Sequence, residues 1–122
     1  MRHASLRRYF RHGMLPQLMV FEAVARLGSF TRAGEELCLA QPTVSVQVRK
    51  LSESLGLALI EQRGRKTVVT EAGKEVYESV QVLFRFFIAT DERLEALRRL
   101  RGVAPPRDEL RESRILEGTG AG

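Results

Sequence analysis

Two stretches with the periodicity of amphipathic helices lie only four residues apart, and this short connection is the strongest constraint on the fold. The second stretch carries apolar residues at i, i+4, i+7 and i+11, namely Val44, Val48, Leu51 and Leu55. These four share one face, which must be buried. The connection is Cys38-Leu39-Ala40-Gln41, after which Pro42 suits the first position of a helix because its missing N–H is not needed there. Helices joined this tightly must cross steeply.

The first stretch, which ends at Leu37, has the features of a supporting helix. Ser29 or Thr31 can cap it, because a hydroxyl oxygen accepts from a free backbone N–H of the first turn. Gly34 follows Ala33, and together these small residues let another backbone approach closely. We therefore expect the second helix to pack against this one.

The outer face of the second helix combines hydrogen-bonding, cationic and small apolar groups. Its members are Pro42, Ser45, Val46, Arg49, Lys50 and Glu53. Such a face can contact base edges and phosphates. Periodicity alone is equally compatible with an ordinary amphipathic helix whose outer face is solvated. The segments on either side favour the binding interpretation.

A basic hairpin is predicted after the second helix. Residues 59–63 and 67–70 are short strand-like runs that flank Gly64-Arg65-Lys66, where glycine suits a turn. Cations at such a tip, Arg63 included, suit phosphate or minor-groove contact. Helix, tight turn, helix and hairpin in this order predict a mostly α fold, a winged helix-turn-helix with a small β-hairpin wing. This device places one helix in the major groove of DNA.

A long helix is predicted over residues 71–101, because Thr70 is a plausible N-cap and no proline follows until Pro105. One heptad-like strip comprises Val76, Val80, Leu83, Phe87, Leu94 and Leu97, and a second comprises Phe84 and Ile88. We expect one strip to pack on the chain's own first helix and the other on a second subunit. The alternative is a helix folded back on its own domain.

The segment from Leu15 to about Leu100 resembles the DNA-binding domain and linker helix of LysR-type transcriptional regulators. The matching residues are Leu18, Phe21 and Val24, Gly28-Ser29-Phe30-Thr31-Arg32-Ala33, Ala40-Gln41-Pro42 with Val44-Ser45, Leu51, Leu55 and Gly56, then Leu59, Arg63, Arg65 and Thr70-Glu71-Ala72-Gly73. Molybdate-type regulators have a similar winged domain, but the run from Ala40 to Ser45 favours the LysR type. The run LAQPTVSVQV and the phenylalanine-rich linker helix resemble regulators of carbon-fixation operons.

The resemblance implies roles for individual residues. Those matched to base or adjacent backbone contacts are Gln41, Pro42 and Ser45, and those matched to phosphate or minor-groove contacts are Thr31, Arg63 and Thr70. With the outer face of the second helix and the wing, the expected DNA-binding set is Thr31, Gln41, Pro42, Thr43, Ser45, Val46, Arg49, Lys50, Arg63, Arg65, Lys66 and Thr70. Many members have arginine where this chain has Val46. Valine cannot donate to guanine but can pack on a thymine methyl, so the preferred base is expected to differ there.

The resemblance also implies a homodimer formed through the linker helix, and the small winged domain needs such a partner for full stability. The expected dimerisation set is Val76, Val80, Leu83, Phe84, Phe87, Ile88, Leu94 and Leu97. Two recognition helices at a fixed separation require double-stranded DNA with dyad half-sites. A second hypothesis is an interaction protein that forms mixed dimers with a full-length relative and impairs its assembly.

The expected domain organisation has four parts. Residues 1–13 form a flexible basic extension, 14–70 the winged domain, 71–101 the linker helix and 102–122 a flexible tail. Met14 as the true start is an alternative. Full-length LysR-type proteins continue into an effector-binding region, so we expect this chain to lack that domain and any small-molecule effector site. Either an excised or truncated product or a natural short form fits this pattern.

Composition limits the remaining function classes. The net charge is +5, but residues 1–28 carry five cations against one anion and residues 29–73 carry six against five, so most of the excess lies outside the motif.

The single cysteine, Cys38, cannot form an internal disulfide and is expected to be a small, buried residue, with a redox sensor as the alternative. His3 and His12 lie in the basic extension, so no metal site, cofactor or catalytic group is predicted and the chain is not expected to be an enzyme. No apolar run reaches about 20 residues, and the arginine-rich start lacks the apolar core of a signal peptide, so we expect a cytoplasmic protein without membrane contact.

Overall fold

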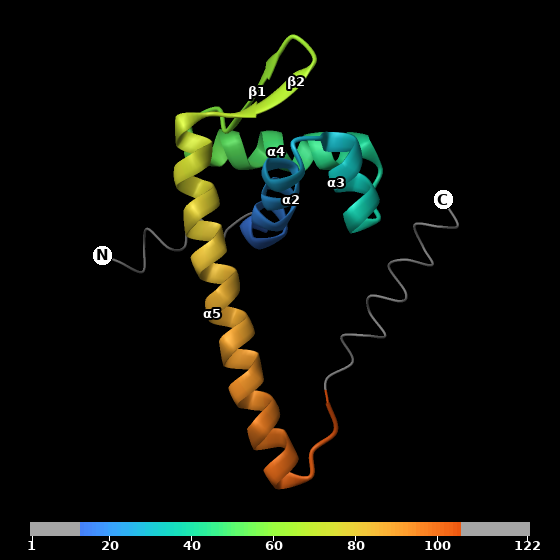
Figure 1. Ribbon diagram of the computed structural model, residues 1–122, viewed down its shortest axis with the longest axis vertical. Helices are drawn as coiled ribbons and strands as arrows, with labels where there is room; N and C mark the ends of the chain where they lie inside the picture. Colours follow the sequence, from blue (N-terminus) through green and yellow to red (C-terminus); the bar gives the residue numbers. More distant parts are fainter. Residues whose placement is uncertain (1–12, 106–122) are drawn as a thin grey trace. The chain divides into compact units, whose positions relative to one another are not determined.

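The computed structural model describes residues 13–105 (Figure 1), and the predictions for the N-terminal extension and most of the tail fall outside the described residues. The elements are α2 (Met14–Leu27), α3 (Phe30–Leu37), α4 (Gln41–Leu55), β1 (Ile60–Arg63), β2 (Lys66–Val69) and α5 (Glu71–Arg101). This order confirms the predicted mostly helical winged helix-turn-helix followed by a long helix. The chain divides into two units between Val80 and Gln81, within α5, and each is described by itself.

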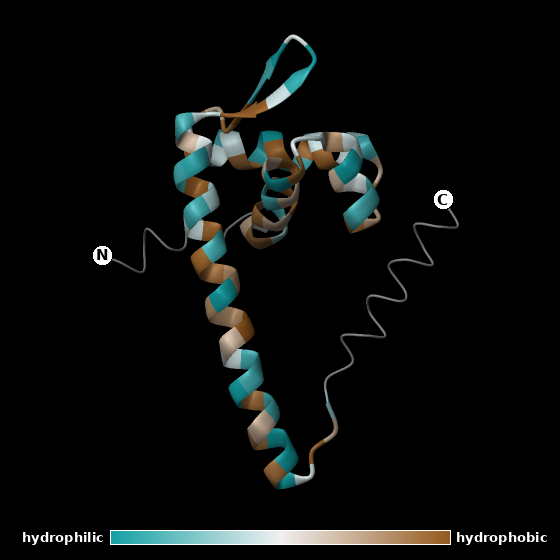
Figure 2. Cartoon of the chain, in the orientation of Figure 1, coloured by the Kyte–Doolittle hydropathy of each residue, from teal (hydrophilic) through white to brown (hydrophobic). Residues whose placement is uncertain are grey.

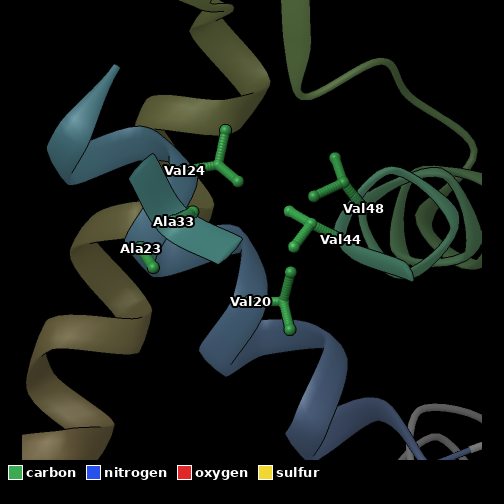
Figure 3. Packing of buried hydrophobic residues seen from close by; sticks show 6 residues of the cluster. All are labelled: Val20, Ala23, Val24, Ala33, Val44 and Val48. Atoms are coloured by element: carbon green, nitrogen blue, oxygen red, sulfur yellow. The ribbon is translucent and has the colours of Figure 1, made fainter. Parts of the chain in front are cut away.

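The core of the first unit begins where α2, α3 and α4 meet. Its buried residues are Val20, Ala23, Val24, Ala33, Val44 and Val48. Figure 3 shows Val20 and Val24 of α2 facing Val44 and Val48 of α4. The predicted inner face of α4 is confirmed, since Val44, Val48 and Leu51 are buried, with Leu55 half-buried at its end. Burial of this face orients the opposite face of α4 toward solvent.

A second buried cluster joins α2 and α4 to the base of the hairpin. Its members are Met14, Phe21, Leu51 and Leu59, with Val69, Val76 and Tyr77 among the half-buried residues packed against it. The first turns of α5 therefore share the core of the winged domain. Val80 is only 2% exposed within a single chain. Its side chain is therefore already covered within one chain, and its predicted place in the dimerisation set stays a prediction.

The connection between α3 and α4 is tighter than a regular loop. Ser29 caps α3 by accepting a hydrogen bond from the Arg32 N–H at 3.0 Å, as predicted. Cys38 ends the helix in the left-handed region, with φ 58°, and is half-buried rather than buried. The Leu39 N–H then donates to the Gly34 carbonyl at 2.8 Å, and a Cβ at Gly34 would lie 2.6 Å from the Leu39 carbonyl oxygen. Only glycine permits this approach.

The predicted start of the second helix was one residue late. Ala40 is the N-cap of α4, so Gln41 is the first helical residue and Pro42 the second. Proline is tolerated there for the same reason as at the first position, since neither N–H has a partner in the preceding turn.

The hairpin has a shorter turn than the sequence suggested. Its antiparallel register runs from Ile60 opposite Val69 to Arg63 opposite Lys66, so the turn is Gly64-Arg65 alone. Lys66 belongs to β2 rather than to the turn. Gly64 has φ 61°, the left-handed conformation that two-residue hairpin turns require at their first position.

Thr70 fastens the base of the hairpin to the start of α5. Its hydroxyl donates to the Ala58 carbonyl at 2.7 Å and accepts from the Gly73 N–H at 3.0 Å, which confirms the predicted N-cap. The Thr70 N–H also donates to the Leu59 carbonyl at 3.0 Å. A Cβ at Gly73 would collide with the Leu59 carbonyl oxygen and lie 2.7 Å from Val69 Cγ1. The long helix therefore begins in close contact with the hairpin base.

A charged network links α2 to α3. The Arg26 guanidinium donates to the carboxylates of Glu22, at 2.9 Å, and Glu36. Hydrogen bonds to Glu36 first and Glu22 second raise the pKa of Arg26, and the same Arg26 hydrogen bond holds the pKa of Glu36 below its ordinary value. Sequence analysis did not anticipate this network, because Arg26 and Glu36 lie on different helices.

The second unit begins at Gln81 within α5, and Figure 2 shows that hydrophobic residues recur along this part of the helix. Many of their side chains are exposed in a single chain. The exposed members of the predicted strips are Phe87, Ile88, Leu94 and Leu97, at 45–60%. Val82 and Phe86 are also exposed, at 58% and 62%, on a face that the sequence analysis had not assigned. Thr90, one turn after Phe86, donates its hydroxyl to the Phe86 carbonyl at 2.8 Å. Among residues 13–105, no helix is long and apolar enough to cross a membrane.

Candidate nucleic-acid interface

The first turn of α4 presents an open helix N-terminus. Gln41, Pro42 and Thr43 are all exposed there. Ala40 caps the helix without a side-chain hydrogen bond, and no acidic residue lies in the first turn. Backbone N–H groups at such a terminus point outward with a partial positive charge, which favours phosphate or base acceptors.

One row of side chains runs outward along α4 from this terminus. Pro42, Val46, Arg49 and Glu53 lie opposite the buried face, at about 100° per residue. Ser45 and Val46 are half-buried, and Arg49 and Lys50 are exposed. Arg49 Nε lies 3.8 Å from a carboxylate oxygen of Glu53. The predicted recognition residues of α4 therefore share its solvent-facing side, with an ion pair at the far end of the row.

The start of α3 adds a second polar edge to the same unit. Thr31 is exposed in its first turn, as a phosphate contact requires. Arg32 is exposed beside it and was absent from the predicted set. Its place one residue after Thr31, at a capped helix start, is the signal that could have included it.

The wing places its cations on one strand face and at its turn. Side chains two apart on a strand share a face, so Glu61 and Arg63 lie together, and Arg63 Nη2 is 3.5 Å from a Glu61 oxygen. Lys66 is the cross-strand partner of Arg63, and Arg65 lies in the turn. All four side chains are exposed. The other strand face carries Gln62, whose amide donates to the Thr67 hydroxyl at 3.0 Å.

Thr70 differs from the other predicted contacts because its hydroxyl proton is already donated to Ala58. A phosphate contact by this side chain would have to replace that hydrogen bond. Its assignment to DNA stays a prediction, as do those of the other predicted contacts.

The winged helix-turn-helix geometry agrees with comparisons to known proteins. Residues 15–74 match the sequence signature of the bacterial regulatory helix-turn-helix proteins of the lysR family. The DNA-binding domain of BenM, solved in complex with catB site 1 DNA, is 31% identical, and the match covers 75% of this chain and 98% of that chain, with a TM-score of 0.60. The chain belongs to the LysR family. It thus contains a DNA-binding regulator domain of that family, as the resemblance implied.

Curated relatives of this LysR-family chain include proteins named as RuBisCO operon transcriptional regulators. The RuBisCO operon transcriptional regulator of Allochromatium vinosum is 49% identical over 87 residues, which are 71% of this chain and 29% of the relative. The transcriptional activator CmpR of Synechocystis sp. is 51% identical over 69 residues, 57% of this chain and 23% of the relative. The chain thus spans less than a third of the length of these relatives. The resemblance to carbon-fixation regulators is confirmed at the level of similarity.

A second solved neighbour, the DNA-binding domain of CbnR in complex with DNA, is 29% identical with a TM-score of 0.62, covering 67% of this chain and 94% of that chain. The LysR family is one of transcriptional regulators. Within residues 13–105, no group of three or more Cys, His, Asp or Glu side chains is arranged to hold a metal ion.

Proposed function

We propose that this chain binds double-stranded DNA sequence-specifically as a homodimer and regulates transcription at a promoter with dyad half-sites. The observation that carries the proposal is the open first turn of α4, with Gln41, Pro42 and Thr43 exposed, in a unit that also carries a cationic wing. The solved complexes of similar domains with DNA support it. A site of action on DNA also places the protein in the cytoplasm.

The proposed contacts divide into two kinds. The first turn and outer row of α4 contact base edges in the major groove, where Gln41 and Ser45 can donate and accept and Val46 can pack on a thymine methyl. The wing residues Arg63 and Arg65 contact phosphates or the minor groove and fix the register of the domain.

Dimerisation through α5 is supported by its exposed apolar residues. Phe87, Ile88, Leu94 and Leu97 are 45–60% exposed in a single chain, with Leu83 and Phe84 half-buried beside them. Burying them against a second copy stabilises the pair by removing apolar surface from water. A dimer also sets the separation of two α4 helices, which requires two half-sites.

The relatives named for the RuBisCO operon support a carbon-fixation promoter as the target. The first experiment is a selection of bound sequences from a randomised duplex library at physiological salt. The DNA upstream of the RuBisCO operon of Allochromatium vinosum serves as a defined second probe. The matched control is Gln41→Ala/Ser45→Ala, with its helix content checked by circular dichroism.

We expect the wild-type chain to enrich a dyad sequence and the control to enrich none. Equal, salt-sensitive retention of all sequences by both proteins would contradict specific binding, because phosphate contacts alone give that pattern. If the chain binds the selected dyad but does not bind the Allochromatium vinosum DNA, only the proposed target promoter is refuted.

A second candidate function is a mixed dimer with a full-length relative, in which this chain impairs the relative's assembly. The exposed apolar strip of α5 favours it, because that strip can pair with another linker helix. Leu94→Glu/Leu97→Glu separates the two functions when the chain is mixed with a full-length LysR-type protein. Interference that needs only Leu94 and Leu97 would establish the mixed dimer, whereas a need for Gln41 and Ser45 would establish operator binding.

A further inference from the structure

Two arginines of the candidate interface are each paired with a carboxylate on the same element. Arg49 Nε lies 3.8 Å from Glu53 on α4, with side chains 66% and 69% exposed. Arg63 Nη2 lies 3.5 Å from Glu61 on β1, with side chains 72% and 49% exposed. Each pair therefore lies in water, on a surface that the proposed function directs toward DNA.

Neither pair holds the fold together. Exposed ion pairs contribute about 0–1 kcal/mol, and each of these lies within a single helix or strand. The Arg26 network differs, because Arg26 on α2 pairs with Glu22 on the same helix and with Glu36 on α3, and so links two helices. Stability alone thus gives no reason for carboxylates beside Arg49 and Arg63.

The carboxylates matter more for the charge that DNA meets. Residues 29–73 contain six cations and five anions, a net charge of +1, and Glu53 and Glu61 are two of those anions. Without their charges the same segment would carry +3. Non-specific affinity for DNA depends mainly on cations that neutralise phosphates, so these two glutamates lower it directly.

We propose that Glu53 and Glu61 are specificity-determining residues that restrain Arg49 and Arg63 in the unbound chain. An arginine exchanges its glutamate for DNA only where a base or phosphate offers charge-assisted hydrogen bonds of good geometry. On other sequences the glutamate keeps the arginine and also repels the phosphates. This inference rests on the proposed DNA-binding function and assigns the source of its selectivity.

The test uses Glu53→Gln, Glu61→Gln and the double variant. Binding is measured to a random-sequence duplex and to the dyad selected by the wild-type chain, over a range of salt concentrations. Each substitution is expected to tighten binding to random duplex by about two- to fivefold. The slope of log affinity against log salt should steepen by up to about 0.9 for each released arginine. Affinity for the dyad should change less, so the ratio of specific to non-specific affinity falls.

Two controls make the test decisive. Glu75→Gln/Glu92→Gln removes two exposed charges from α5, neither of which is paired with Arg49 or Arg63. In an Arg49→Gln background, Glu53→Gln should tighten binding much less, because the arginine that it restrains is gone and only the repulsion of phosphates is removed. Circular dichroism and thermal melting confirm that every variant is folded.

Unchanged affinity for random duplex would overturn the inference, and so would an equal gain in the α5 control. An undiminished effect of Glu53→Gln in the Arg49→Gln background would also overturn it, since the glutamate would then act by repulsion alone. Failure of the proposed function is a separate outcome: the wild-type chain would enrich no sequence, whatever the glutamate variants do to random duplex.

Discussion

The two units of this chain use their apolar residues in opposite ways. Up to Val80, the core side chains of the winged domain are at most 6% exposed, and α2, α4, the hairpin base and the first turns of α5 contribute to it. From Gln81 onward, seven large apolar side chains of α5 are 45–84% exposed. The first unit buries its core within a single chain. The second leaves these side chains in water there, and under the proposed function a second copy of the chain buries them.

The strongest test of this contrast replaces the same residue type in each unit. Phe21 is fully buried, and Phe87 is 54% exposed. Phe21→Ala should lower the free energy of unfolding by about 3–5 kcal/mol, because it removes buried surface and leaves a cavity. Phe87→Ala should change the unfolding of the winged domain by less than about 0.5 kcal/mol, measured by hydrogen exchange of α2 and α4 amides.

For the affinity of the proposed dimer, the change at Phe87 is expected to have the larger effect and a change at Phe21 the smaller one. Phe87→Ala should weaken self-association in sedimentation experiments, whereas a folded chain with the conservative change Phe21→Leu should associate as the wild type does. Equal losses of stability from the two alanine substitutions would remove the distinction between the units.

A smaller effect is expected at the contact between the helix and the hairpin base. Gly73→Ala adds a Cβ that collides with the Leu59 carbonyl oxygen and approaches Val69 Cγ1, so the two elements must separate. Overpacking of this kind costs about 1–3 kcal/mol of unfolding free energy, measured by urea denaturation. Ser79→Ala, at an exposed position of the same helix, is the matched control and should be neutral. A neutral Gly73→Ala would show that the start of α5 is not closely packed in solution.

The smallest effect concerns the pH dependence of the first unit. Because Arg26 lowers the pKa of Glu36, the ionised carboxylate stabilises the folded state above the ordinary carboxyl pKa of about 4.3. This contribution disappears as the pH falls through the lowered pKa of the folded state. Thermal melting of wild type and Glu36→Gln should therefore differ at neutral pH and converge in acid. Glu95→Gln, which removes a pair within α5, should leave the melting of the winged domain unchanged; a constant gap for Glu36→Gln at all pH values would refute the linkage.

Patterns of local origin were predictable from the sequence. The buried face of α4 follows from the spacing of Val44, Val48 and Leu51, and the caps at Ser29 and Thr70 follow from hydroxyls placed before helical runs. These features depend on neighbouring residues along the chain, so a single sequence contains the information. The resemblance to the LysR family added the position of the candidate interface.

Features that depend on contacts between distant residues were missed. Val80 falls on the heptad-like strip, but its burial depends on the packing of the first unit. The left-handed Cys38 and the start of α4 at Gln41 depend on how closely Gly34 and Leu39 approach. The exposed face of Val82 and Phe86 went unassigned because these residues fall on neither of the two apolar strips that the sequence spacing picked out.

The hydrogen bonds of Thr70 have a consequence for the entropy of binding. Its hydroxyl links Ala58 to Gly73, and its N–H holds Leu59, so both strands of the hairpin are anchored before any DNA arrives. Ordering a flexible loop on a ligand opposes binding, and much of that ordering is already complete here. The conformational freedom left to be lost lies mainly in the long side chains of Arg63, Arg65 and Lys66. Under the proposed function, affinity gained at the wing is therefore set by how these side chains are immobilised rather than by the folding of the hairpin.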